Sequence, residues 1–84
     1  MAKLIAPNGV ISFTQPANGK HFSLKELQEA VEGYIEIVRL ENDLIMVVNE
    51  EGRLRNLPFN ESASALAKQS IVGRVLICKD NEVK

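Results

Sequence analysis

Residues 44–48 are apolar at every position, Leu-Ile-Met-Val-Val, and this run constrains the fold more than any other stretch of the chain. Successive side chains of a strand point to opposite faces of a sheet, so neither face of such a strand can be left in water. A second run rich in β-branched residues, 35–40, precedes it, and the polar residues Glu41, Asn42 and Asp43 separate the two. This order of signals predicts a β-hairpin whose second strand is a central strand of the sheet.

A second hairpin is predicted at the start of the chain. Residues 3–6 and 10–13 flank a turn that contains Asn8 and Gly9, and Asn-Gly is the pair that most readily adopts the positive φ angles of a tight turn. Residues 14–20 contain Pro, Asn and Gly without periodicity, which is typical of a surface loop.

The strongest helix signal lies at residues 24–32. Ser23 and Glu26 have the spacing of a capping box, in which each side chain bonds the backbone amide of the other residue. Phe22 and Leu27 are spaced to pack together as a hydrophobic staple. Gly33 is predicted to supply the left-handed conformation that commonly ends a helix.

The second half of the chain contains signals for two more strands and a helix. Asn49 and Gly52 occupy the first and fourth positions of a type I turn, which predicts a further hairpin with residues 53–55 as an edge strand and Leu54 pointing inward. A second helix is predicted to begin after residue 60 or 62 and to end near residue 69. Residues 71–78 read as the last strand, buried from residue 75 onward.

These elements predict an α+β fold in the order β-β-α-β-β-β-α-β. The sheet is expected to be mainly antiparallel, with both helices packed on one face. Residues 1–79 are predicted to form a single domain, and residues 80–84 a flexible C-terminal tail. The content of 45% hydrophobic and 25% charged residues is typical of a soluble globular protein.

The composition also limits the partners and the compartment. Ten basic residues against eleven acidic ones give a net charge of −1, so no global field attracts nucleic acid or an anionic membrane. No apolar run approaches the roughly 20 residues of a membrane-spanning helix. The single Cys78 cannot form an intramolecular disulfide, and residues 1–6 do not resemble a signal peptide, so we expect a cytoplasmic protein.

Catalytic groups are scarce in this sequence. His21 is the only imidazole, and Cys78 lies in an apolar strand where a thiol stays protonated. Glu50 and Glu51 are adjacent turn residues, which usually diverge into solvent and therefore lack the burial that raises a carboxyl pKa. The chain has neither the Cys/His set of a zinc site nor the spacing of a calcium loop. We therefore predict no catalytic residue, no metal, no cofactor and no enzymatic activity.

The remaining polar signals suggest a binding module. An acidic turn followed by alternating arginines could recognise a protein partner, and an exposed edge strand could also pair two copies into a homodimer. Alternatively, the arginines and the start of the second helix could hold a nucleotide or another phosphorylated metabolite. Ordinary solvated turn and strand faces would have the same sequence. The candidate partner-binding or ligand-binding residues are Asn49, Glu50, Glu51, Arg53, Arg55 and Asn60.

Several short motifs occur in an order that resembles one known family. They are Gly-Tyr-Ile-Glu at residues 33–36, Asn-Glu-Glu-Gly at 49–52, Leu-Pro-x-Asn at 57–60 and Ile-Val-Gly at 71–73. This region, residues 24–78, resembles a family of small proteins often encoded by phages and mobile elements and grouped as a domain of unknown function. The resemblance implies no activity, cofactor or site residue. By analogy, it suggests interference with a host system.

Overall fold

One antiparallel sheet of five strands forms the centre of the computed structural model, which describes residues 2–83. The strands are β1 (Ala2–Ile5), β2 (Ile11–Thr14), β3 (Ile35–Arg39), β4 (Leu44–Asn49) and β5 (Val75–Lys79), in the spatial order β2-β1-β5-β4-β3. The helices are α1 (Leu24–Val31), α2 (Glu61–Ala67) and the 3-10 turn η1 (Asp80–Glu82). The predicted α+β class with a mainly antiparallel sheet is confirmed.

The apolar run at residues 44–48 forms β4, which pairs with β3 on one side and β5 on the other. Residues 45–48 are each no more than 5% exposed, as expected for a strand covered on both faces. The predicted β3–β4 hairpin is also present. Asn42 and Asp43 close it with φ angles of 60° and 61°, the pattern of a type I′ turn that matches the twist of the two strands.

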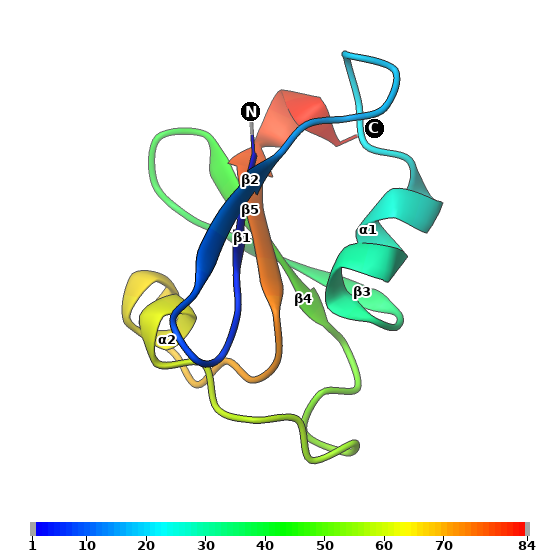
Figure 1. Ribbon diagram of the computed structural model, residues 1–84. Helices are drawn as coiled ribbons and strands as arrows, with labels where there is room; N and C mark the ends of the chain where they lie inside the picture. The colour runs from blue at the N-terminus through cyan, green and yellow to red at the C-terminus, as the bar shows by residue number, and fades with distance from the viewer. Residues whose placement is uncertain (1, 84) are drawn as a thin grey trace.

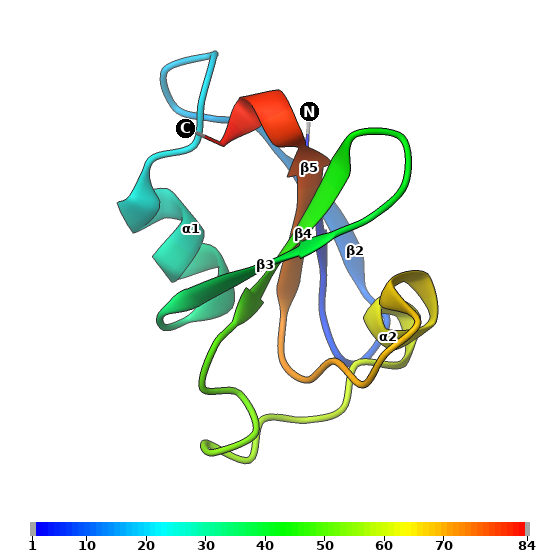
Figure 2. The same ribbon diagram turned by 180° about the vertical axis from the view of Figure 1, so that it is seen from behind.

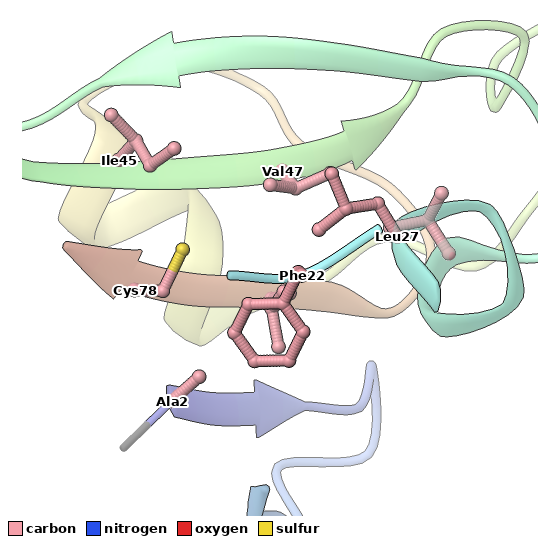
Figure 3. Packing of buried hydrophobic residues seen from close by; sticks show 8 residues of the cluster. Ala2, Phe22, Leu27, Ile45, Val47 and Cys78 are labelled. Atoms are coloured by element: carbon pink, nitrogen blue, oxygen red, sulfur yellow. The ribbon is translucent and has the colours of Figure 1, made fainter. Parts of the chain in front are cut away.

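The two helices lie on opposite faces of the sheet, as the two views in Figures 1 and 2 show. The prediction that both helices share one face is therefore wrong. The physical reason lies in β4, whose apolar side chains project to both faces and require cover on each. The cluster beneath α1, drawn in Figure 3, contains Ala2, Phe22, Leu27, Val31, Ile45, Val47, Leu76 and Cys78. The cluster beneath α2 contains Ile5, Met46, Val48, Ala63, Ile71, Val75 and Ile77.

The predicted strand at residues 53–55 is also wrong. Residues 50–56 form consecutive turns instead, beginning with the bond from the Gly52 amide to the Asn49 carbonyl at 3.2 Å. The predicted turn is present, but no strand follows it. Since β3 and β5 already pair with both edges of β4, the chain that leaves β4 cannot form a hairpin with that strand.

The N-terminal hairpin is confirmed, and the structure adds its place in the sheet. Its turn positions Gly9 at φ 91°, and the amide of Ala6 donates to the carbonyl of Val10 at 2.9 Å. Since β1 also pairs with β5, β2 becomes the outermost strand on that side of the sheet.

The start of α1 follows its sequence signals closely. Ser23 Oγ accepts from the Glu26 amide at 3.1 Å, and Glu26 Oε1 accepts from the Ser23 amide at 2.8 Å, which confirms the capping box. Phe22 and Leu27 are 5% and 2% exposed and belong to the same core cluster. The second oxygen of Glu26 accepts from the Ala17 amide at 3.0 Å, so the same carboxylate anchors the preceding loop. These bonds to the ionised form lower the Glu26 pKa.

The end of the chain returns to the start of α1. After β5, residues Asp80–Glu82 form η1, and the Phe22 amide donates to the Glu82 carbonyl at 2.7 Å. Val83 then pairs with Phe22 in a parallel bridge. Most of the segment predicted as a tail therefore lies against the domain in this structure.

Candidate functional site

The candidate residues separate into two places. Asn49, Glu50, Glu51, Arg53 and Arg55 lie at the end of β4 and in the turns that follow, the yellow-green loop at the bottom of Figure 1. Asn60 does not share this surface. It precedes α2, is 0% exposed, and its side-chain amide donates to the carbonyls of Ile5 at 3.0 Å and Gly73 at 2.9 Å.

Asn49 joins the start of this loop to the end of α1. Its Nδ2 donates to the Val31 carbonyl at 3.0 Å, and its Oδ1 accepts from the Glu51 amide at 2.8 Å. Gly33 permits this approach, because a Cβ at that position would lie 2.7 Å from Asn49 Nδ2. The left-handed residue that ends α1 is Glu32, with φ 64°. The predicted role of Gly33 as the left-handed residue is thus wrong. Glycine is needed here because a side chain at residue 33 would clash with Asn49.

Two arginines complete the C-terminal end of α1. Arg55 Nη1 donates to the Glu32 carbonyl at 2.6 Å. Arg74 donates from Nε to the Ala30 carbonyl at 2.6 Å and from Nη2 to the Glu29 carbonyl at 3.1 Å. The last turn of α1 contains no basic residue of its own, so positive charge from elsewhere in the chain complements the helix dipole.

Arg53 reaches in another direction. Its Nη2 donates to the Ser70 carbonyl at 3.1 Å, which joins the loop to the segment after α2. Arg53 lines a groove of about 340 Å³, together with Glu36, Glu50, Leu54, Gln69 and Ser70. Arg55 lines a separate groove of about 290 Å³ with Gln28, Gly33, Tyr34 and Glu51. The two guanidinium groups therefore do not converge on one cradle for a phosphate.

These bonds hold the turns of residues 50–56 from both sides and leave an apolar side chain at the surface. Leu54 is 84% exposed. Tyr34 is 63% exposed and lines the groove of Arg55 and Glu51, not that of Leu54. Sequence reasoning missed Leu54 because it placed this residue on the inner face of a strand that does not form. No local pattern distinguishes an outward leucine in a turn from one that is buried.

The thiol of Cys78 lies in the core cluster beneath α1. Cys78 is 1% exposed, and burial raises the pKa of its thiol to about 11, with the Glu82 and Asp80 carboxylates adding to this effect. A thiol with such a pKa is protonated at neutral pH and is a poor nucleophile. Within residues 2–83, no three His, Cys, Asp or Glu side chains are grouped so that they could hold a metal ion.

Cys78 gives a direct test of this packing. At pH 8 we expect Cys78 in the native protein to react with a thiol-reactive disulfide reagent at least about 100-fold more slowly than in urea-unfolded protein. Burial blocks access to the sulfur, and the raised pKa lowers the fraction of thiolate. A Cys78→Ala, Ser62→Cys variant carries an exposed thiol on α2 and should react at once. Fast labelling of native Cys78 would contradict the observed core.

The fold and this loop define a class: small α+β domains with a five-stranded antiparallel sheet, one helix on each face, and a hydrogen-bonded loop that displays an apolar tip. None of the helices within the described residues is both long and apolar enough to cross a bilayer. The chain belongs to the family described as Domain of unknown function (DUF3846), and the match spans residues 4–84. The match therefore includes most of the N-terminal hairpin, beyond the residues 24–78 that carried the resemblance. No curated protein and no solved structure matched the chain.

Proposed function

We propose that this chain is a non-enzymatic module that binds another protein through the turns of residues 50–56 and the neighbouring Tyr34. The observation that carries the proposal is Leu54, a large apolar side chain that is 84% exposed on a loop with bonds to α1 and to Ser70. A well-exposed apolar residue in a hydrogen-bonded loop suits insertion into a pocket of a partner.

The surroundings of Leu54 support a protein as the partner. Arg53 and Arg55 flank it in sequence, and Glu50 and Glu51 precede them, so apolar contact would be bordered by charges of both signs. Such a rim orients a partner and excludes wrong ones more than it adds affinity. Because Arg55 and Asn49 already restrain the loop, little conformational entropy would be lost on binding.

A phosphorylated ligand has less support. Arg53 and Arg55 donate to different backbone carbonyls and line different grooves. At the start of α2, the Ala63 amide donates to Asn60 Oδ1 at 3.0 Å and is thus already bonded. Thermal unfolding with a nucleotide panel separates the two functions, because a ligand at 100 times its Kd would add about 2.7 kcal/mol of stability.

The biological setting extends the proposal. We place the protein in the cytoplasm, where the buried Cys78 thiol remains reduced. The resemblance to a family often encoded by phages and mobile elements suggests that the partner is a host protein and that binding interferes with a host system. This extension rests on family analogy.

The variant Leu54→Asp tests the proposed surface. We expect its melting temperature to match that of the wild type, since the side chain is exposed, and its affinity for the partner to fall at least about tenfold. The partner would be isolated from the native host by affinity purification and titrated by calorimetry. Leu24→Asp, at an exposed position of α1 (59%), is the matched control and should bind normally. Arginine variants are less suitable because Arg53 and Arg55 also hold the loop.

Undiminished binding by Leu54→Asp would show that the partner does not use this loop. A nucleotide that stabilises the wild type would instead favour the sequestration of a phosphorylated metabolite.

A further inference from the structure

The outermost strand β2 presents an unpaired edge with exposed apolar side chains. Ile11 is 50% exposed and Phe13 is 66% exposed. In its pairing with β1, Ile11 lies opposite Ile5, Ser12 opposite Leu4, and Phe13 opposite Lys3. Figure 1 shows β2 at the border of the sheet, with β1 as its neighbour.

The hydrogen-bond pattern shows which backbone groups face outward. The Ala6 amide donates to the Val10 carbonyl at 2.9 Å, so that pair is hydrogen-bonded. Hydrogen-bonded and non-hydrogen-bonded pairs alternate along an antiparallel ladder, which makes Ser12 a bonded residue and leaves Ile11 and Phe13 unbonded to β1. The amides and carbonyls of Ile11 and Phe13 therefore point away from β1, toward the open edge.

This edge strand is short and carries neither charged residues nor proline. Exposed edges commonly carry charged residues or proline, which discourage pairing with another chain. The opposite edge strand, β3, contains Glu36 and Arg39. By contrast, β2 has no charged residue, and neither does any position from 4 to 19 of the sequence. A second copy approaching β2 would therefore meet no like charge and bury no charge on this strand.

We propose that β2 pairs with β2 of a second copy of this chain, antiparallel and about a two-fold axis at Ser12. This register places Ile11 of each copy opposite Phe13 of the other copy. Each of these pairs would be hydrogen-bonded, giving about four new backbone bonds and joining the two sheets into one. Ile11 and Phe13 would also contact across the strands on the face that carries α2, while the two Ser12 residues meet on the other face.

The side chains of β2 suit a second copy, because the two-fold register brings Ile11 against Phe13 twice and no like charges face one another. The outward-facing groups of Ile11 and Phe13 are placed symmetrically about Ser12, so one strand satisfies another identical strand without an offset. The proposal does not rest on the binding function assigned to residues 50–56, which lie outside β2. Because the contact is short, we expect a dissociation constant between about 10 µM and about 1 mM.

Ser12 provides a test that is specific to this axis. In the dimer the two Ser12 Cβ atoms would lie roughly 4.5–5.5 Å apart, so Ser12→Lys and Ser12→Glu each place like charges opposite one another. We expect each variant alone to dimerise about fivefold more weakly than the wild type, and an equimolar mixture of the two to regain the lost affinity. Sedimentation equilibrium up to about 1 mM would measure the masses against the 9.3 kDa chain.

Ser62→Lys and Ser62→Glu make the same changes at an exposed position of α2 and should dimerise as the wild type does. Amide exchange adds a residue-level measurement: at high concentration, exchange should slow at Ile11 and Phe13 but not at Ser12, whose amide already faces β1. A wild-type chain that remains at 9.3 kDa at about 1 mM overturns the proposal. Dimers that form equally well in both Ser12 variants, or a mixture that regains no affinity, also overturn it.

Discussion

Asn60→Ala is expected to lower the free energy of unfolding by about 3 kcal/mol. The wild-type side chain is 0% exposed and bonds three backbone groups: the carbonyls of Ile5 and Gly73 and the amide of Ala63. Alanine would remove all three of these buried bonds and with them the N-cap of α2. Urea unfolding measures the loss, and the melting temperature should fall by more than about 10 °C.

Two further variants test whether the loss of stability in Asn60→Ala comes from the lost hydrogen bonds of Asn60 or from replacing any asparagine. Asn60→Asp keeps the shape and the acceptor to Ala63 but replaces the donor by an oxygen that faces two carbonyls, so we expect it to destabilise at least as strongly. Asn81→Ala changes an exposed asparagine in η1 and should be close to neutral. If Asn60→Ala melts like the wild type, the proposed tie between β1, β5 and α2 is absent.

Asn49→Ala is expected to lower the free energy of unfolding by about 2 kcal/mol. The side chain is 5% exposed, and its loss leaves the Val31 carbonyl and the Glu51 amide without partners. The turns of residues 50–56 would also lose one of their restraints, so amide exchange at Glu51 should accelerate. If Leu54 contacts the partner, the same variant should weaken binding through this loss of order.

Gly33 offers a matched test of the contact with Asn49. A Cβ at residue 33 would lie 2.7 Å from Asn49 Nδ2 and 2.8 Å from Arg55 Nη1, so Gly33→Ala should destabilise the wild type. In an Asn49→Ala background the first clash is absent. We therefore expect the two changes to be non-additive by about 1 kcal/mol, with the double variant more stable than the sum of the single changes predicts. Strict additivity would mean that the two residues do not touch.

Features that depend on neighbouring residues could be predicted from the sequence. The capping box needs only Ser23 and Glu26, three positions apart, and both of its bonds form. The hairpins likewise follow from short polar turns between apolar runs, and the burial of β4 follows from its unbroken apolar character. These signals also determine the α+β class.

Features that depend on which strand edges remain free could not be predicted in this way. Asn49–Gly52 forms the expected turn, yet residues 53–55 form no strand because β3 and β5 occupy both edges of β4. The consequence reaches the candidate surface, since Leu54 becomes exposed instead of buried.

The sequence by itself therefore determined most of the local elements of this protein, apart from the strand expected at residues 53–55, and the need to bury β4, because helical and strand periodicity and capping act over a few residues. Only the tertiary structure decided that one helix covers each face, that β2 forms an open border, and that Asn49, Arg55 and Arg74 bond the end of α1. These bonds join residues 18 to 45 positions apart. Their formation depends on how the whole sheet is assembled, and no local pattern in the chain encodes that assembly.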